Sequence, residues 1–575
     1  MGDPQQGIRL NTRAKEQQTY DAIVIGSGIS GGWAAKELCE KGLKTLLLDR
    51  GRNVEHIKDY PTSTLNPWDF AHGLQNSEKD KAENPIQSQS YDEGSKLFYV
   101  SDREHPYVQQ HGSFNWIRGY HVGGRSLTWG RQCYRLSDLD FEANAKEGIG
   151  IDWPIRYKDI APWYDYVENF VGISGQPEGL AHLPDGQLLP PMEMNFLEKH
   201  FKEQVNKKFG GRCVTIGRTA NLSRGWKDRG PCQYRNLCSR GCPFGGYFSS
   251  NSATIPAALA TGNLVLRPYS IVAEILYDKD RKRARGVRII DAMTHESIEF
   301  FSSVLFLNAS TIASTSILLQ SKSPAFPEGL GNTNDLLGRY LMDHHLRAGA
   351  QALFHGFPDE YYSGRRPTNI YVPRFRNLDE ASRHPDYTRG FAYQGTGLRQ
   401  GWDDLSKSVP GFGADFKKQL TAPGPWTMWL GAWGETLPYA ENKVALSSDK
   451  KDKWDLPLVE IDFSFKANEQ AMRKDAKKSA AEMLEAAGFS SIDEFDYNPP
   501  GGSAVHEMGT ARMGHDAKTS ILNARNQVHG INNLFVTDGS CMTSSACQNP
   551  SLTYMALTAR ACDYAITEMK KGNIT

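Results

Sequence analysis

A glycine-rich turn near the N-terminus constrains the fold more than any other feature of the sequence. The apolar segment 20–25 runs directly into GSGISG, in which Gly26, Gly28 and Gly31 precede a stretch of helical character, and a second apolar segment ends at Asp49. In such units the first glycine allows a tight turn, the second lets the backbone approach a pyrophosphate, and the third allows close packing of helix on strand. The pattern predicts a dinucleotide site, with Asp49 accepting hydrogen bonds from ribose hydroxyls. The motif alone does not separate NAD from FAD.

Three later stretches favour FAD. A second glycine-rich loop contains Gly123 and Gly124, which could bring the backbone against a flat ring. Residues 264–320 contain a hairpin pattern followed by a buried strand, and a last buried strand near the C-terminus ends in Asp538 and Gly539. A nucleotide-binding domain that needs chain from both ends suits a long cofactor lying across it.

The C-terminal region contains residues suited to catalysis. His506 lies in a glycine-bracketed turn, and Asn549 opens a helical segment. Neutral imidazole, with an unperturbed pKa near ~6.5, suits removal of a hydroxyl proton around neutral pH. We interpret His506 as a base, Asp538 as a cofactor-holding carboxylate and Asn549 as a substrate-orienting amide.

Composition excludes several classes of function. The chain has 575 residues and a formal net charge of +0, which gives no electrostatic reason to expect nucleic acid. No apolar run approaches the ~20 residues needed to cross a bilayer, so we expect no membrane span. The first twenty residues lack the apolar core of a signal peptide, and we therefore expect no export signal of the chain's own.

These elements make the chain resemble the glucose–methanol–choline (GMC) flavoprotein oxidoreductases along nearly its whole length. The likeness to the family rests on GSGISG, the Gly-Gly loop and GRYLMDH at 338–344. Within the family the chain most resembles pyranose 2-oxidases and bacterial FAD-dependent glucoside 3-dehydrogenases. This narrower likeness rests on HEMGTARMG, which contains His506, and NPSLT, which begins at Asn549. It implies an α/β fold (α+β overall) with a Rossmann-like FAD-binding domain and a substrate domain on an antiparallel sheet. Pyranose oxidases attach the flavin to a histidine where this chain has Thr128, so we expect non-covalent FAD.

The resemblance also suggests a division of the chain into discontinuous segments. We assign residues 19–135, 212–322 and 500–575 to the FAD-binding domain, and residues 136–211 and 323–499 to the substrate-binding domain. Within the substrate part, apolar patterns predict helices at 157–171, 194–209 and about 468–487, and strands at 348–354 and 458–465.

One tryptophan-rich segment of the substrate part, residues 426–435, has two interpretations. Trp429 and Trp433 would share one face of a helix, whereas alternation would put Trp429, Gly431 and Trp433 on one face of a strand. Aromatic faces suit the apolar C–H faces of sugars, and core packing is the competing role.

Three cysteines stand close together in a loop that contains glycine and proline. Cys232, Cys238 and Cys242 are followed by Pro243, a spacing typical of iron–sulfur ligands. Three thiolates suit a 3Fe-4S cluster, or a 4Fe-4S cluster with an outside fourth ligand. Ordinary cysteines or a disulfide remain alternatives, as does zinc, which normally takes four protein ligands in a structural site.

We therefore predict an FAD-dependent dehydrogenase that oxidises a secondary hydroxyl, at C3, of a sugar or glycoside to a keto-sugar. His506 takes the hydroxyl proton, Asn549 matches the family's second His/Asn position and aligns the C–H bond, and hydride passes to flavin N5. Electrons then leave through the cluster. His344 and His345 match a family element next to the flavin domain, and we expect both to be structural.

Two other functions remain open, an oxygen-using pyranose 2-oxidase-like enzyme and a non-catalytic flavin-binding scaffold subunit. The resemblance further implies a small partner subunit that carries the export signal, and a cytochrome acceptor. Export with such a subunit would place the enzyme in the periplasm, and a cytoplasmic location is the alternative.

Overall fold

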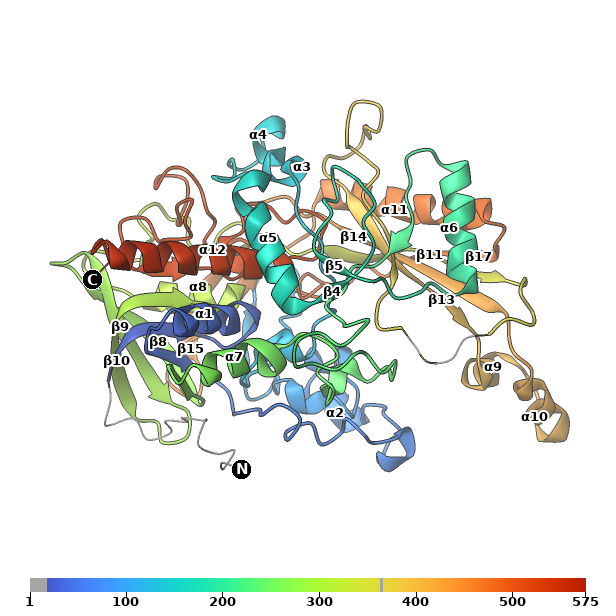
Figure 1. The fold of residues 1–575 in the computed structure, drawn as a ribbon, viewed down its shortest axis with the longest axis horizontal. Coiled ribbons are helices and arrows are strands. Elements are labelled where there is room, and N and C mark those ends of the chain that lie inside the picture. The colour runs from blue at the N-terminus through green and yellow to red at the C-terminus, as the bar shows by residue number, and fades with distance from the viewer. Residues whose placement is uncertain (1–17, 362–363, 365, 575) are drawn as a thin grey trace.

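Two large sheets, one towards each end of the longest axis, organise the chain (Figure 1). The computed structural model describes residues 18–361, 364 and 366–574. Residues 1–17, on which most of the expectation about a signal peptide rests, lie outside the described residues. Among the residues described, no helix is both long and apolar enough to span a bilayer.

The first sheet has the order β7-β2-β1-β10-β9-β8, with β18 paired to the end of β10. Strands β1, β2, β7, β10 and β18 run parallel, whereas β8, β9 and β10 form an antiparallel meander. The parallel strands carry continuous apolar runs because both of their faces are buried. Their bounds are β1 Thr19–Ile25, β2 Thr45–Leu48, β7 Leu264–Arg267, β8 Ser270–Asp278, β9 Arg283–Asp291, β10 Ser297–Leu307 and β18 Leu534–Val536.

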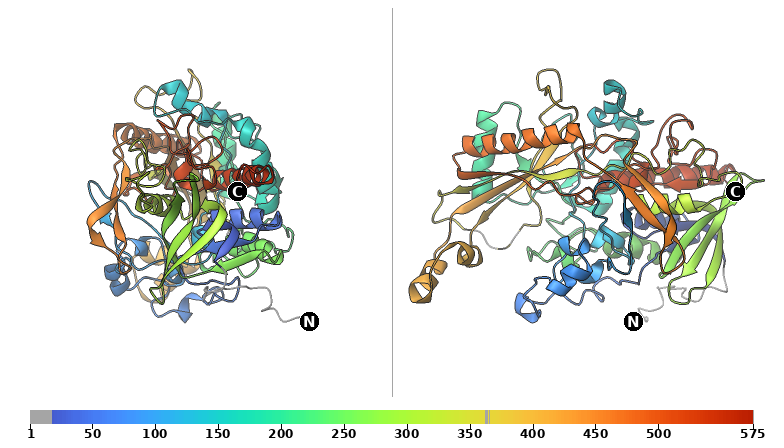
Figure 2. Two further views of the ribbon diagram at one scale, coloured as in Figure 1. Left: turned by 90° about the vertical axis from the view of Figure 1, so that its left-hand side faces the viewer. Right: turned by 180° about the vertical axis from the view of Figure 1, so that it is seen from behind.

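Helices from distant parts of the chain cover this sheet. Helix α1 (Ile29–Glu40) packs against α12 (Ser551–Lys570) and α7 (Ile255–Ala260), and α12 packs against α5 (Tyr157–Val171). Figures 1 and 2 show α12 beside α1 although they stand at opposite ends of the sequence. The helix expected at 157–171 is present, but its buried side chains join the core of this first sheet and not that of the substrate part.

The second sheet is antiparallel throughout, with the order β17-β11-β14-β13-β12-β6. Helices α6 (Phe196–Lys208) and α11 (Ala467–Ala486) cover one face and bury an apolar core against it. Strand β6 belongs here, although its residues fall in the segment 212–322 that we assigned to the FAD-binding domain. The strands are β6 Thr215–Ile216, β11 His345–Phe354, β12 Ile370–Val372, β13 Phe391–Arg399, β14 Trp426–Gly434 and β17 Ser490–Asp496.

The tryptophan-rich segment is the strand β14, so the alternating interpretation is confirmed. Trp426, Met428 and Leu430 are buried on the helix-covered face, which leaves Trp429 and Trp433 on the other face. The strand expected at 458–465 is β16 (Pro457–Asp462), which forms a three-stranded sheet in the order β15-β16-β3.

The remaining elements are short and lie in connecting segments. Two neighbouring helices, α9 and α10, project from the end of the second sheet (Figure 1). The bounds are β3 Val108–Gln109, β4 Ile173–Ser174, β5 Leu188–Leu189, β15 Lys443–Lys451, α2 Glu78–Glu83, α3 Asp138–Phe141, α4 Ala143–Glu147, α8 Thr311–Gln320, α9 Trp402–Ser408 and α10 Gly413–Thr421, with single turns at 67–69, 87–89, 96–98, 124–127, 238–240, 250–254 and 539–541.

Candidate functional site

A cavity of about 570 Å³ opens at the carboxyl ends of the parallel strands of the first sheet. This edge is where α/β sheets bind ligands, because the turns that follow the strands diverge there. Six of the predicted cofactor-binding residues line the cavity, together with His506 and Asn549; the six are Gly26, Gly28, Asp49, Gly124, Asp538 and Gly539. Segments from both ends of the chain therefore meet around one space.

The turn before α1 has the geometry of a diphosphate cradle. Gly28 is the N-cap of α1 and makes no side-chain capping bond, and a Cβ built on it would meet no atom within 4 Å. Gly26 has a positive φ of 93°, and a Cβ there would lie 2.4 Å from the carbonyl oxygen of Asn308. A Cβ on Gly31 would lie 1.7 Å from the carbonyl oxygen of Gly26. Gly26 and Gly31 thus permit packing, while Gly28 leaves the helix N-terminus open to an anion.

Asp49 connects this turn to the second glycine-rich loop. Its carboxylate accepts the backbone N–H groups of Ser27 at 3.2 Å and Gly51 at 2.8 Å. The Ser27 hydroxyl donates to Asp49 and accepts the N–H of Gly123 at 2.8 Å. Gly124 follows with its Cβ position 3.5 Å from the Cα of Gly28, so the two glycine turns pack against each other at the cavity wall.

Asp538 lies where β18 ends and is buried. Its carboxylate accepts the hydroxyl of Ser314 on α8 at 2.5 Å and the N–H of Ser540 at 3.0 Å. Burial raises the pKa of Asp538 above its usual value. A Cβ on Gly539 would lie 2.4 Å from the carbonyl oxygen of Glu507, so this glycine lets the Asp538 turn pack directly on the His506 turn.

His506 and Asn549, 43 positions apart in the sequence, meet at the cavity wall. The distance from Asn549 Nδ2 to His506 Nε2 is 3.1 Å. Asn549 Oδ1 accepts a hydrogen bond from Gln394 Nε2 at 2.9 Å, and Gln394 belongs to β13 of the second sheet. The bond from Gln394 orients the amide so that its N–H group points at the imidazole.

A backbone carbonyl determines which nitrogen of His506 carries the proton. His344 Nε2 lies 2.8 Å from the carbonyl oxygen of Ala546, which can only accept, so His344 carries its proton on Nε2. Its Nδ1 is then an acceptor, and it lies 2.9 Å from His506 Nδ1, which must donate. The lone pair of His506 is therefore on Nε2, on the side of Asn549. Burial lowers the pKa of His344 to about 4, so this histidine stays neutral in the chain of bonds.

The expected structural role of His344 includes direct contact with the proposed base. His345 is fully buried, with its ring 3.1 Å from Met472 Sδ, which agrees with a packing role. Sequence position could not separate the two histidines. Consecutive residues of an extended segment point in opposite directions, and only the placement of the His506 turn decides which of them meets it.

The turn that carries His506 is held by a buried carboxylate. Asp343 accepts the N–H groups of His506 at 3.0 Å and Ala504 at 3.3 Å. Burial, together with the charge of Glu507, raises the pKa of Asp343 to about 7. For His506, burial first and then the neighbouring His344 and Arg125 hold the pKa well below its usual value, so the imidazole is neutral at neutral pH.

A second ion pair joins the same turn to the glycine-rich loop. Arg125, which follows Gly124, binds Glu507 through two parallel contacts of 3.0 and 2.6 Å, and Glu507 is 2% exposed. Such bidentate pairs fix geometry as well as charge. The sequence analysis did not single out Arg125 or Glu507, nor did it identify Gln394, which lies in an ordinary strand with no local signal of function.

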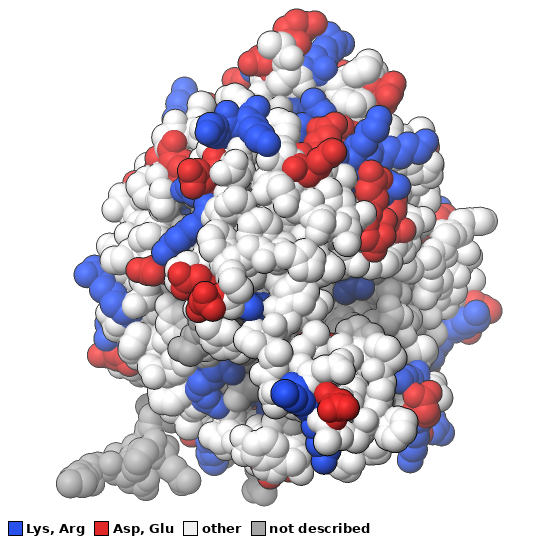
Figure 3. All heavy atoms as spheres, turned by 90° about the vertical axis from the view of Figure 1, so that its right-hand side faces the viewer, with Lys and Arg blue, Asp and Glu red and all other residues white. Residues whose placement is uncertain are grey.

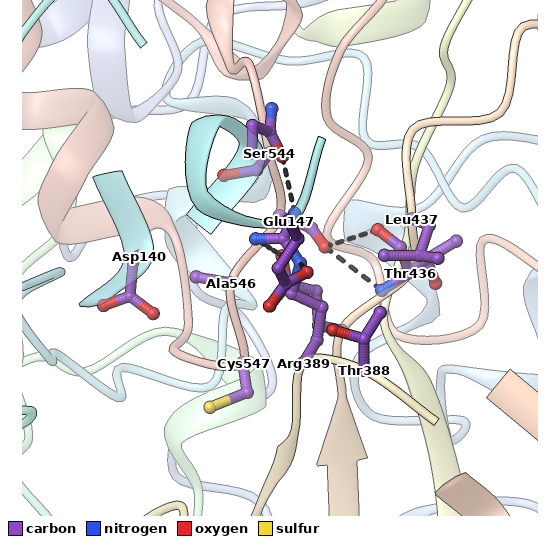
Figure 4. A network of polar contacts seen from close by, with 12 residues as sticks. Asp140, Glu147, Thr388, Arg389, Thr436, Leu437, Ser544, Ala546 and Cys547 are labelled. Carbon is purple, nitrogen blue, oxygen red and sulfur yellow. Dashed lines mark hydrogen bonds and ion pairs between the residues drawn. The ribbon is translucent and has the colours of Figure 1, made fainter. Parts of the chain in front are cut away.

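A buried polar network supports the loop that leads to Asn549. The fully buried Arg389 pairs with Glu147 at 2.8 Å and donates to Asn144 Oδ1 at 2.7 Å (Figure 4). The hydroxyl of Ser545 bridges the N–H and the carbonyl of Thr436, at 3.2 and 3.0 Å. Asn144 in turn donates to the carbonyl of Thr543 at 3.2 Å. The loop is therefore anchored on both sides, and the carbonyl of Ala546, which accepts from His344, has a defined position.

The cysteine loop does not form the predicted cluster site. Across the described residues, no group of three or more His, Cys, Asp or Glu side chains has an arrangement that could hold a metal ion, and Cys232, Cys238 and Cys242 are free thiols. Burial raises the pKa of Cys232 to about 11, which favours the thiol over the thiolate that metals bind. The three cysteines lie beside a single turn at 238–240 in a partly exposed loop. The predicted iron–sulfur cluster is therefore not supported.

The open space beside Gly28 leads to a testable prediction. Gly28→Val should fold, because no protein atom lies near the new side chain, but its FAD content should fall roughly tenfold or more because the methyl groups enter the diphosphate space. The ratio of flavin to protein absorbance measures this, with circular dichroism as the check on folding. Gly210→Val is the matched control, since Gly210 also meets no atom within 4 Å but does not line the cavity. Full flavin content in Gly28→Val would contradict the assignment.

Comparisons with known proteins agree with this geometry. Two family models, both described as GMC oxidoreductase, match residues 20–346 and 438–558. The fructose dehydrogenase large subunit of Gluconobacter japonicus is 26% identical over 97% of this chain and 100% of its own length. The 2-methyl-1,2-propanediol dehydrogenase of Mycolicibacterium austroafricanum is 28% identical over 95% of this chain and 94% of its own length.

A solved structure shows the same fold. Pyridoxine 4-oxidase from Mesorbium loti superposes with a TM-score of 0.61 at 17% identity, covering 95% of this chain and 99% of that one. The fold, the cavity and the two matching family models lead to one conclusion. The chain belongs to the GMC oxidoreductases, which bind FAD and act on the CH–OH group of sugars or other alcohols.

Proposed function

We propose that this protein oxidises a secondary hydroxyl, at C3, of a sugar or glycoside and passes the electrons to an acceptor other than oxygen. The observation that carries the proposal is the meeting of His506 Nε2 and Asn549 Nδ2 at the cavity wall, 3.1 Å apart. Relatives that act on fructose and on a diol support the substrate class. The choice of C3 rests on the motif around His506 and Asn549, which resembles that of glucoside 3-dehydrogenases.

The two side chains suit an alcohol because a hydroxyl that replaces their direct contact would meet one acceptor, His506 Nε2, and one donor, the Asn549 amide. A hydroxyl oxygen about 2.8 Å from both nitrogens would donate its proton to His506 Nε2 and accept the N–H of Asn549. Removing the proton makes the carbinol C–H bond a better hydride donor, and Asn549 holds the oxygen while the bond reorients. The bound flavin would supply the hydride acceptor. Gln394 and His344 keep the donor and the acceptor in place.

The residues of the cavity support FAD held without a covalent bond. Thr128 lines the cavity at the position where pyranose oxidases have the flavin-linked histidine, and a hydroxyl makes no such bond. The diphosphate would lie on the N-terminus of α1, with Asp49 and Asp538 at the cavity wall. We assign no electron-transfer step to the cysteine loop.

We also propose a small partner subunit, export of the enzyme to the periplasm with that subunit, and a cytochrome as the acceptor. The designation of the fructose dehydrogenase relative as a large subunit supports the partner. An oxygen-using enzyme is the second candidate, because the structural neighbour is an enzyme named as an oxidase.

Anaerobic reduction of the flavin tests the substrate class and the position of attack. Glucose, a methyl glucoside and a disaccharide should each bleach the flavin band without oxygen, and NMR of the product should show the carbonyl at C3. An artificial acceptor should support turnover with little hydrogen peroxide. A product oxidised at C2, or stoichiometric peroxide, would favour the oxidase instead, and no bleaching by any of the three would reject the proposal.

The pKa directions predict how the rate depends on pH. Because the pKa of His506 is lowered, the neutral base is fully present from pH 6 to 8 and is lost only well below pH 6.5. Asp343, with a pKa of about 7, is the group that titrates inside this window, and it ionises as the pH rises. The rate of anaerobic flavin reduction in Asp343→Asn should therefore change by less than about threefold between pH 6 and 8. A titration near pH 6.5 that persists in this variant would assign an ordinary pKa to His506.

Replacing the proposed base tests its role directly. His506→Ala should retain FAD, since the diphosphate cradle is untouched, and flavin reduction should slow by roughly 10²–10⁴-fold. Stopped-flow absorbance under nitrogen measures the rate. His515→Ala is the control, because His515 follows in the same segment and is exposed. An unchanged rate in His506→Ala would remove this residue from the mechanism.

A further inference from the structure

The face of the second sheet opposite α6 and α11 carries an aromatic row next to the candidate site. In the antiparallel register Gln394 of β13 stands opposite Gly431 of β14, so both point to the same face. Trp429 and Trp433 lie two positions on either side of Gly431 and share that face. The side chain of Gln394 reaches Asn549 at 2.9 Å, and the face with the two tryptophans therefore looks towards the site.

Three rings of this face run in series towards solvent. Trp429 is stacked with Phe495 of β17 at 5.8 Å and 7°, and Phe495 with Tyr497 at 5.1 Å and 13°. Phe495 is 5% exposed, Trp429 is half-buried and Tyr497 is 62% exposed. Gly431 makes room for the ring of Trp429, because a Cβ on Gly431 would lie 2.3 Å from that ring.

The aromatic row is continuous with the cavity through Arg347. This exposed residue lines the cavity and lies where the pairing of β11 with β14 shifts register. Its carbonyl accepts the backbone N–H of Tyr497 at 3.2 Å. The row therefore begins on the sheet face that carries Gln394 and ends at Tyr497, next to a residue of the cavity wall. Figure 3 shows that the substrate-domain end of the molecule is hollowed.

We propose that Trp429, Phe495 and Tyr497, with Arg347, form an outer subsite for the second ring of a glycoside. The ring that is oxidised would lie at His506, and the ring attached to it would pack on the aromatic row. Aromatic side chains offer large, rigid apolar faces at little entropic cost, and sugars present apolar C–H faces to them. The Arg347 guanidinium adds hydrogen-bond donors for ring hydroxyls.

This inference rests on the proposed function and narrows it to substrates with two rings. The methyl group of a methyl glucoside would not reach the aromatic row, whereas the outer ring of phenyl glucoside or a disaccharide would. Loss of the aromatic row should therefore lower kcat/KM for the two-ring substrates more than kcat/KM for a substrate with a single sugar ring. A merely structural role of the aromatic row would lower the activity towards all three substrates alike.

The test compares kcat/KM for phenyl glucoside and a disaccharide with that for methyl glucoside in the FAD-loaded enzyme. In Tyr497→Ala and in Trp429→Leu, the ratio of two-ring to one-ring kcat/KM should fall about 3- to 10-fold, the usual worth of one aromatic contact. Tyr497 is largely exposed, so its variant is expected to fold even where Trp429→Leu does not. Phe412→Ala, which removes a 93% exposed ring at α10, is the matched control and should leave the ratio unchanged.

The outcomes separate the inference from the function on which it depends. A ratio that stays within twofold of wild type in Tyr497→Ala, or equal losses for all three substrates, overturns the outer subsite while the oxidation of sugars stands. A wild-type enzyme that oxidises none of the three overturns both.

Discussion

The carbonyl oxygen of Ala546 is the interaction on which the chemistry of the site depends. A carbonyl can only accept, so it places the proton of His344 on Nε2 and leaves Nδ1 to accept from His506. The lone pair of His506 is therefore on Nε2, on the cavity side. If the carbonyl were turned away, His344 could adopt the other tautomer and the lone pair of His506 could move to Nδ1, away from the substrate.

That carbonyl is held by contacts that extend through both halves of the molecule. Its loop is anchored by the buried Arg389 network on one side and by Thr436 on the other. Asn549, at the end of the same loop, takes its orientation from Gln394 of the second sheet, while the cofactor cradle belongs to the first sheet. The site is thus assembled where the two sheets meet, and movement of one sheet against the other would take Gln394 away from Asn549. Low dielectric makes such buried polar contacts strong when they are all satisfied.

The cysteine loop shows where a local pattern gained no support from the structure. The spacing of Cys232, Cys238 and Cys242 is compatible with a cluster, but spacing alone places no sulfur atom in space. Ligands must converge on one point as thiolates, and burial raises the pKa of Cys232, which favours the thiol. The glycine motif forms the tight turn that its sequence predicts, because its contacts are local. The closeness of Gly26 and Gly31 follows from one tight turn of a few residues, and any chain with this sequence between a strand and a helix meets the same steric limits.

The amino-acid sequence by itself determined the parallel strands and the glycine turn, and its resemblance to a family singled out His506 and Asn549 as candidates for the active pair. The strands and the turn depend on short-range hydrophobic periodicity and on residue type, and both can be read from neighbouring positions in the sequence. Only the tertiary structure decided that His344 and not His345 contacts the base, that Gln394 orients the amide, and that α5 packs with the first sheet. Each of these contacts joins residues far apart in the chain, and which side chains meet there depends on the register of one strand or the approach of one loop. A shift of a single residue in that register would turn Gln394 to the opposite face of its sheet.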